Sequence, residues 1–357
     1  MAADLGSIRL LRLDGDGIGP EIMSATVSVL GAAEAYSTRA LEIASEPIGF
    51  AALEAEGSTI PDRVIDAAQA ADGVLLGPVS HNVYPPREKG GLNPSGVLRG
   101  ALALYANIRP ARTWPGVPYR GHGPLDLVVV RENLEGFYSD RNMHQGPGEI
   151  MPVPGVAMAF RKITAEGSLR IARAAFEIAR VRSAKAVTAV HKANVMRLSD
   201  GLFLDCVREV AAEHPEITYD EVLVDAAAAH LVRDPSRFDV IVTTNMFGDI
   251  LSDLASELSG GLGLAGSLNR GTVGAAAQAQ HGSAPDIAGT DQANPVSLIL
   301  SATMLLRHLG EPLAADRIEG ALGACLAAPE TRTRDLGGQL GTSAFTRAVI
   351  AKLGEIT

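Results

Sequence analysis

Short apolar runs recur along the chain and constrain its fold more than any other feature. They are rich in Val, Leu and Ile and lie at 8–13, 73–77, 126–130, 185–190, 221–224 and 239–243. Continuous apolar runs of this length are typical of strands buried on both faces of a sheet. Helical patterns lie between them, such as 164–180, where Thr164 is the expected N-cap of an amphipathic helix. Strands that alternate with helices predict an α/β fold.

The charge and composition of the chain exclude several classes of protein. Its 357 residues suffice for two domains or one large one, and its 46% hydrophobic content argues against disorder. The formal net charge is −10. Clusters of Lys and Arg that would neutralise phosphates are not evident, so we expect no nucleic-acid partner.

The two cysteines, Cys206 and Cys325, have no spacing typical of a disulfide framework or a zinc site. We expect both to be small buried side chains. The first residues show no signal-peptide pattern, and no apolar run has the length of a membrane helix. These observations predict a cytoplasmic protein without a membrane partner.

Two segments interrupt the alternation of strands and helices. Residues 145–155 are dense in Gly and Pro and are interpreted as a projecting arm or a long loop. Residues 266–283 are small and are interpreted as flexible, with a linker as one possibility.

Polar residues follow four of the apolar runs directly. They are Arg131–Asn133, His191–Asn194, Asp225 and Thr244–Asn245. Ligands of open α/β sheets bind at the carboxyl ends of the strands, so this edge is the expected site.

The glycine-rich stretch GDGIGPE, residues 15–21, does not match the Rossmann fingerprint. That pattern requires glycine at its sixth position, where this chain has Pro20, and Asp16 would repel a pyrophosphate. A proline here instead suits the first turn of a helix. Any nucleotide site is therefore expected elsewhere in the chain.

Asp249 and Asp253 stand four residues apart in NMFGDILSDLASEL. On a helix they share a face, with Cβ atoms about 5–6 Å apart, and they repel unless a cation lies between them. With Asp225 as a third carboxylate they would suit Mg²⁺ or Mn²⁺. A solvated acidic helix face is the alternative.

Three arginines, Arg99, Arg109 and Arg131, would suit a di- or tricarboxylate, because a guanidinium matches a carboxylate in a bidentate manner. Ordinary ion pairs are the alternative. Lys192 and Tyr138 are candidate proton carriers, since a buried lysine beside a metal can act as a base. A structural role remains open for each.

The segment HGSAPDIAGTDQANP, residues 281–295, is the candidate cofactor segment. His281 would stack or form hydrogen bonds, and Gly282 would permit close approach of the backbone. Asp286 would accept hydrogen bonds from ribose hydroxyls and would reject the 2′-phosphate of NADP. If a nicotinamide dinucleotide binds here, NAD is therefore expected rather than NADP.

Long motifs spread over nearly the whole chain are shared with one enzyme family. They are GDGIGPE, NIRP, VVVRENLEGFYSD, VHKANV, VDAAAAHLV, NMFGDILSDLASEL, HGSAPDIAG and RDLGG. On these motifs the chain resembles the isocitrate and 3-isopropylmalate dehydrogenases, which are metal-dependent β-decarboxylating dehydrogenases. The resemblance implies a two-domain α/β fold of the isopropylmalate-dehydrogenase type, with a cofactor site that is not of the Rossmann type.

The resemblance also implies a domain arrangement and an assembly. Residues 1–100 and 255–357 would form a large, discontinuous cofactor-binding domain. Residues 101–254 would form a small domain that carries dimerisation helices and an arm at about 140–160. Active sites would be shared in a homodimer, with the partner subunit contributing Lys192, Asn194 and Asp225.

Roles for individual residues follow from the same resemblance. Arg99, Arg109 and Arg131 would bind the carboxylates of a malate-type substrate, and Asp225, Asp249 and Asp253 would bind Mg²⁺ or Mn²⁺. Lys192 would take the hydroxyl proton and Tyr138 would protonate the enol carbon. NAD would be bound by Asn194, His281, Gly282, Asp286, Ile287, Asn294 and Asp335.

The residues before Arg99 bear on the substrate. In the family that this chain resembles, isopropylmalate enzymes have leucines at the two positions where this chain has Ser95 and Gly96. Isocitrate enzymes place Ser and Asn where this chain has Asn93 and Ser95. A polar pocket for the 3-substituent follows, because leucines would disfavour a carboxylate and polar groups gain little from an isopropyl group.

The expected reaction is therefore NAD-dependent oxidative decarboxylation of an isocitrate-like 3-substituted (2R)-malate, by an isocitrate or homoisocitrate dehydrogenase. The alternatives are a 3-isopropylmalate dehydrogenase or a tartrate or D-malate dehydrogenase. An alternative of another class is a non-catalytic regulatory subunit.

Overall fold

The computed structural model describes residues 6–138 and 148–355. The chain divides into two compact units. Unit 1 comprises Met1–Leu104, Trp114–Pro118 and Gly260–Thr357, and unit 2 comprises Tyr105–Thr113 and Tyr119–Ser259. The part of the expected arm at 140–147 lies outside the described residues.

Unit 1 contains five strands in the spatial order β2, β1, β3, β12 and β11. Their bounds are β1 Ile8–Leu13, β2 Leu41–Ser45, β3 Gly73–Leu76, β11 Leu268–Arg270 and β12 Ala275–Gln278. Parallel pairing joins β1 to β2 and β3, and β3 to β12, whereas β11 is antiparallel to β12. The helices are α1 Gly19–Ala33, α2 Phe50–Glu56, α3 Asp62–Ala70, α4 Pro94–Ala101, α9 Val296–His308, α10 Pro312–Ala327 and α11 Thr342–Leu353.

Strand β1 carries apolar residues on both of its faces, although Arg9 is exposed and Arg12 is half-buried. Successive side chains of a strand point to opposite faces. Ile8 and Leu10 join a core cluster with α1, α9, α10 and α11, whereas Leu11 and Leu13 join a second cluster with α3 and α4. Both faces of the strand are therefore buried, as the run at 8–13 predicted.

Strands β11 and β12 correct one prediction. Residues 266–283 are not a flexible linker, because most of their middle forms two paired strands. The alanines that suggested flexibility pack closely instead: Ala275 and Ala277 lie in one core cluster and Ala276 lies in the other. Small side chains permit this packing on both faces, so composition alone was misleading.

Unit 2 contains strands in the spatial order β4, β5, β10, β8 and β9. Their bounds are β4 Ala106–Arg112, β5 Asp126–Glu132, β8 Ala186–His191, β9 Thr218–Leu223 and β10 Val240–Thr243. Strand β4 is antiparallel to β5, and the remaining pairs are parallel. The helices are α5 Ala165–Val181, α6 Ser199–Glu213, α7 Val224–Arg233 and α8 Asn245–Ser259.

The elements of unit 2 refine the expectations from the sequence. Thr164 is confirmed as the N-cap of α5, since its side chain accepts a hydrogen bond from the main-chain N–H of Gly167 at 3.0 Å. Asp225 lies in the first turn of α7 rather than directly after a strand, because β9 ends at Leu223. Helices α7 and α8 cover one face of the sheet through a cluster that includes Val129, Ile241 and Leu251.

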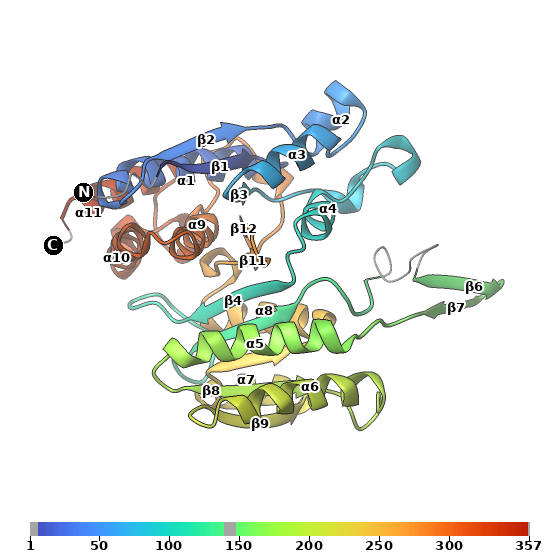
Figure 1. The fold of residues 1–357 in the computed structure, drawn as a ribbon. Helices are drawn as coiled ribbons and strands as arrows, with labels where there is room; N and C mark the ends of the chain where they lie inside the picture. The colour runs from blue at the N-terminus through green and yellow to red at the C-terminus, as the bar shows by residue number, and fades with distance from the viewer. Residues whose placement is uncertain (1–5, 139–147, 356–357) are drawn as a thin grey trace. The chain divides into compact units, whose positions relative to one another are not determined.

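A two-stranded hairpin extends from unit 2 where the sequence predicted a projecting arm (Figure 1). It consists of β6, Glu149–Val153, and β7, Val156–Ala159. Its large apolar side chains are exposed, among them Met151, Val153 and Met158.

Two further findings concern the whole described chain. Cys206 and Cys325 are free and buried. None of the helices in the described ranges is long and apolar enough to cross a membrane.

Candidate active site

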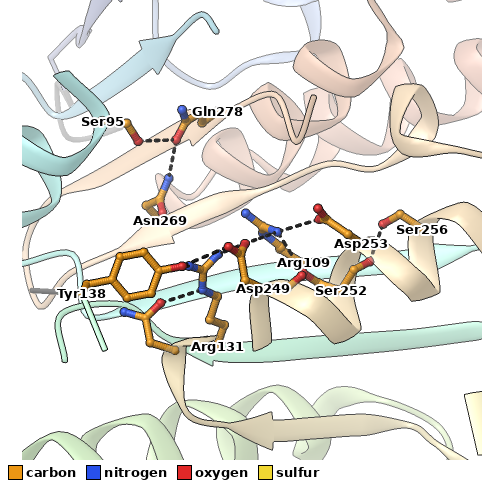
Figure 2. A network of polar contacts seen from close by, with 11 residues as sticks. Ser95, Arg109, Arg131, Tyr138, Asp249, Ser252, Asp253, Ser256, Asn269 and Gln278 are labelled. Carbon is orange, nitrogen blue, oxygen red and sulfur yellow. Dashed lines mark hydrogen bonds and ion pairs between the residues drawn. The ribbon is translucent and has the colours of Figure 1, made fainter. Parts of the chain in front are cut away.

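Two arginines from neighbouring strands of unit 2 meet the first half of α8. Arg109 belongs to β4 and Arg131 belongs to β5, and these strands are antiparallel neighbours. Arg131 Nη1 bonds to Asp249, and its Nε donates to Asn245 Oδ1 at 2.9 Å. Figure 2 shows both guanidinium groups directed at the same carboxylate, that of Asp249. The structure thus brings these predicted residues together.

Asp249 and Asp253 lie one helical turn apart on α8 and share Arg109. The Nη1 atom of Arg109 is 3.2 Å from Asp249 Oδ1 and 3.0 Å from Asp253 Oδ1. The same nitrogen donates to Ser252 Oγ at 2.8 Å. The two carboxylate side chains remain 40% and 49% exposed, so their oxygens stay accessible to a ligand.

The two guanidinium groups are themselves buried, with 9% of the Arg109 side chain and 2% of the Arg131 side chain exposed. Burial and the neighbouring Arg131 lower the pKa of Arg109 to about 10, against the opposing effect of the two aspartates. Two buried cations beside two accessible carboxylates form a site that can bind an anion and a cation side by side.

Tyr138 completes this group. Its hydroxyl accepts a hydrogen bond from Arg131 Nη2 at 2.6 Å and donates one to Asp249 Oδ2 at 3.0 Å. Arg131 also lies over the ring, 5.5 Å from its centroid. The phenol is therefore held between a cation and an anion, where it can give up or receive a proton.

Lys192 and Asp225 form a second pair in unit 2. Lys192 Nζ lies 2.5 Å from Asp225 Oδ1. Hydrogen bonding to Lys192 lowers the pKa of Asp225. Within the described residues of one chain, no three acidic, histidine or cysteine side chains are grouped so as to hold a metal. One chain therefore does not bring Asp225 together with Asp249 and Asp253. Asn194 follows Lys192 in an exposed turn.

The candidate residues near Arg99 lie on helix α4 of unit 1. Asn93 is the N-cap of this helix, and its Oδ1 accepts a hydrogen bond from Gly96 N at 3.3 Å. Ser95 is buried and donates to Gln278 Oε1 at 3.0 Å, as Figure 2 shows. Both polar side chains predicted to bind substrate therefore have internal partners. Arg99 lies in the last turn of α4.

The predicted cofactor segment also lies in unit 1. His281 is partly buried, and this burial lowers its pKa; its Nδ1 bonds to the carbonyl of Gly282 at 3.0 Å. Its Nε2 finds no hydrogen-bond partner within the part of the chain that the structure describes. Asp286 and Ile287 form a short 3₁₀ turn with Pro285.

Asn294 and Asp335 come together from distant parts of the sequence. Asn294 Nδ2 donates to Asp335 Oδ2 at 2.8 Å, and Asn294 Oδ1 accepts from Val296 N at the start of α9. Two residues that the sequence analysis assigned to the cofactor site are therefore direct neighbours.

The stretch GDGIGPE, residues 15–21, packs against the main chain of the candidate cofactor segment at Ser283. The main-chain N–H of Ile18 donates to the carbonyl of Ser283 at 2.8 Å. Gly17 has a φ of +57°, and a Cβ at this position would lie 2.0 Å from that same carbonyl oxygen. Only glycine permits this approach. No sequence pattern indicated this contact, since Ser283 is far away along the chain.

Other supporting residues were also missed. Asn245 and Ser252 hold the two guanidinium groups in place. The sequence offered one signal for Asn245, its position directly after an apolar strand, and none for Ser252. Both are buried, so their polar atoms require partners.

Comparisons with known proteins point to one family. A family model described as isocitrate/isopropylmalate dehydrogenase matches residues 9–349. A 3-isopropylmalate dehydrogenase of Archaeoglobus fulgidus is 43% identical over 345 residues, covering 97% of this chain and 99% of the relative. An isocitrate/homoisocitrate dehydrogenase of Thermus thermophilus is 43% identical over 346 residues, covering 97% and 98%.

Two further similarities extend this result. A probable NAD isocitrate dehydrogenase subunit alpha, mitochondrial, of Caenorhabditis elegans is 41% identical over 354 residues, covering 98% of this chain and 93% of the relative. Among solved structures, isocitrate dehydrogenase from Methylococcus capsulatus matches with a TM-score of 0.87 and 40% identity, covering 97% of this chain and 99% of that chain.

Proposed function

Because the chain belongs to the isocitrate/isopropylmalate dehydrogenase family and is a β-decarboxylating dehydrogenase, we propose that it oxidatively decarboxylates a 3-substituted (2R)-malate with NAD⁺. The proposed substrate is isocitrate or homoisocitrate. The observation that carries the proposal is the convergence of Arg109, Arg131 and Tyr138 on Asp249, beside Asp253. Such a site combines anion binding, cation binding and proton transfer, and this reaction requires all three.

Arg109 and Arg131 bind the substrate carboxylates in this proposal, together with Arg99 of unit 1. Each guanidinium presents several donors in a fixed plane, which matches the geometry of a carboxylate. Arg131 is well suited to orient the substrate, because Asn245 fixes its Nε. Because the fork is already fixed, its side chain loses little conformational freedom when the substrate binds.

Asp249 and Asp253 fit a divalent cation, because they supply oxygen ligands from adjacent turns of one helix and remain accessible. Asp225 of a second chain is the proposed third ligand. When bound, Mg²⁺ or Mn²⁺ supplies Lewis-acid chemistry. The contribution of the protein is to hold these carboxylates close to the two arginines.

Lys192 and Tyr138 are the proposed proton carriers. Lys192 takes the proton of the substrate C2 hydroxyl, and Tyr138 delivers a proton to the enol carbon after CO₂ has left. Tyr138 is poised for this step, since its hydroxyl is hydrogen-bonded to Arg131 and Asp249. Lys192 comes from the partner subunit in this proposal.

The segment at 281–295 fits a dinucleotide. The buried Nε2 of His281 offers an acceptor, and a Cβ added at Gly282 would meet no atom within 4 Å, so the backbone there borders open space. Asp286 receives the ribose hydroxyls and, with Ile287, favours NAD over NADP. Asn194, Asn294 and Asp335 are the remaining proposed contacts. When bound, the nicotinamide accepts the hydride from C2.

The proposal includes a homodimer with shared active sites and the division into a large domain at 1–100 and 255–357 and a small domain at 101–254. The exposed apolar side chains of β6 and β7 support a role for this hairpin in association. The cytoplasmic location expected from the sequence remains part of the proposal.

A 3-isopropylmalate dehydrogenase is the second candidate, because the relative from Archaeoglobus fulgidus bears that name at 43% identity. The internal hydrogen bonds of Asn93 and Ser95 also leave these side chains less available to a third carboxylate. We favour an isocitrate-like substrate because Ser95 and Gly96 supply no large apolar surface for an isopropyl group.

The test is a panel of initial rates of NADH formation with Mn²⁺. The substrates are isocitrate, homoisocitrate, 3-isopropylmalate, D-malate and tartrate, each with NAD⁺ and with NADP⁺. We expect the highest kcat/KM for isocitrate or homoisocitrate with NAD⁺. A higher value for 3-isopropylmalate would refute the polar pocket, and a higher value with NADP⁺ would refute the role of Asp286.

A further inference from the structure

Arg161 and Asp200 form a buried ion pair in unit 2 that has no role in the reaction proposed above. The Arg161 side chain is 7% exposed and that of Asp200 is 0% exposed. Arg161 lies between β7 and α5, and Asp200 lies in the first turn of α6. A buried ion pair is weak evidence of stabilisation, because desolvation of the charges offsets their attraction. The other contacts of this pair indicate what it does.

The first set of contacts leads from Asp200 to Lys192. The second carboxylate oxygen of Asp200 accepts the main-chain N–H of Lys192 at 2.6 Å. The N–H of Asp200 in turn donates to the carbonyl of Met196 at 3.0 Å, and the N–H of Met196 donates to the carbonyl of Lys192 at 2.9 Å. Asp200 thus fixes the backbone from which the Lys192 side chain projects.

The second set leads from Arg161 towards Tyr138. The guanidinium lies 5.7 Å from the ring centroid of Phe137, which immediately precedes Tyr138. Next to Arg161, Lys162 exchanges two main-chain hydrogen bonds with Gly136, at 2.8 and 3.0 Å. Arg161 and its neighbour Lys162 therefore both contact the segment that carries Tyr138.

Arg161 also contacts the start of α8. Its Nη2 donates to Thr244 Oγ1 at 2.8 Å, and its guanidinium lies 5.5 Å from the ring centroid of Phe247. Thr244 precedes Asn245, which holds Arg131. One buried cation therefore contacts the segment before Tyr138 and the helix that carries Asp249.

We infer that Arg161 and Asp200 are positioning residues for both proton carriers of the chain, Lys192 and Tyr138. The inference rests on the proposed function, in which the two carriers of one chain serve different active sites of a homodimer. The pair then links the two sites. Tyr138 acts in the site of its own chain, whereas Lys192 acts in the site of the partner.

The homodimeric variants test the positioning role. Arg161→Met removes the charge, and we expect kcat to fall about 100-fold, since a small misplacement of reacting groups has an effect of this size. The KM for NAD⁺ should change far less than kcat, because all the proposed cofactor contacts except Asn194 lie in unit 1. Arg161→Lys keeps the charge beside Asp200 and should restore most of the activity. Unchanged kcat in Arg161→Met would overturn the inference.

Arg182→Lys and Arg182→Met are the matched controls. Arg182 pairs with the buried Asp239 in the same unit, directly before β10 begins, and contacts neither carrier. Both control variants should leave kcat within about twofold. If Arg161→Met does not fold, Asp200→Asn replaces it, since it removes the charge and keeps an oxygen that can accept from Lys192. If Asp200→Asn lowered kcat no more than the Arg182 variants do, the inference would be overturned.

Mixed dimers test the link between the sites. A dimer with one Tyr138→Phe chain keeps one intact site and should retain half of the wild-type activity. A dimer with one Arg161→Met chain has a misplaced Tyr138 in one site and a misplaced Lys192 in the other. It should retain about one tenth or less. Retention of half would show that only one carrier depends on the pair and would overturn the inference.

A complementation experiment separates this inference from the proposed function. Mixing Tyr138→Phe chains with Lys192→Met chains should restore activity, because one site of the mixed dimer then contains both wild-type carriers. Failure to restore activity would refute shared active sites and, with them, the link between the sites. The kcat of the Arg161→Met homodimer would still decide whether the pair positions the carriers.

Discussion

Asn245 joins two parts of the candidate site through its side-chain amide. It is buried, with 1% exposed. Its Oδ1 accepts from Arg131 Nε at 2.9 Å, and its Nδ2 donates to the carbonyl of Glu135 at 2.8 Å. The amide therefore connects the guanidinium proposed to hold substrate with the segment that leads to Tyr138. Asn245→Ala removes both hydrogen bonds at once.

The magnitude follows from these two contacts. Loss of a hydrogen bond to a charged group costs about 1.5–3 kcal/mol, and a buried carbonyl left without its donor costs about 1–3 kcal/mol. Arg131 keeps its contacts with Asp249 and Tyr138, so the guanidinium remains partly satisfied. We therefore expect Asn245→Ala to lower the free energy of unfolding by about 3–5 kcal/mol.

Unfolding in guanidinium chloride, with linear extrapolation to zero denaturant, measures this change in the free energy of unfolding. Ser259→Ala is the control, since Ser259 lies in the same helix, is also buried and donates only to the carbonyl of Ser256. It should lose about 1 kcal/mol. In the assay, Asn245→Ala should raise the KM for the hydroxy acid more than that for NAD⁺. A loss below about 1 kcal/mol with an unchanged KM would refute the reasoning, since typical single hydrogen bonds already contribute that much.

Three further predictions concern other parts of the site. Removal of divalent metal with EDTA should abolish activity, and Asp253→Asn should raise the Mn²⁺ concentration needed for half-maximal rate by about 10-fold or more, as a rate titration would show. Burial lowers the pKa of His281, so its neutral form is favoured on folding. The contribution of neutral His281 to the free energy of unfolding is full above pH 6.5 and declines as the pH falls below 6.5. His281→Gln should remove this decline when unfolding is measured over a range of pH. Gly17→Ala, with a Cβ only 2.0 Å from the carbonyl oxygen of Ser283, should destabilise the fold by about 1–3 kcal/mol and raise the KM for NAD⁺, whereas Gly31→Ala should do neither.

The fold was largely predictable because its strands are buried on both faces. A strand such as 8–13 needs apolar residues on both of its faces, and few other structures have that requirement. The prediction failed at 266–283 because Ala275, Ala276 and Ala277 have no strong strand preference. Their burial is set by the sheet that they join, which a local pattern does not contain.

The residues of the candidate site were predictable where the chemical group of the side chain itself indicates a role. Arg109, Arg131, Asp249 and Asp253 were singled out by residue type and spacing, and the structure groups them. Their supports were not predicted, because Asn245 and the pair of Arg161 and Asp200 act through neighbours that are distant along the chain. Residue type alone does not reveal such contacts.

In the proposed function, the site oxidises and decarboxylates one hydroxy acid in a single metal-dependent cycle. The most direct measurement is the ratio of NADH to CO₂ formed from isocitrate or homoisocitrate, with Mn²⁺ and with EDTA. We expect one NADH for each CO₂, and neither product with EDTA or in Lys192→Met. NADH without CO₂, or both products in the presence of EDTA, would contradict the proposed function.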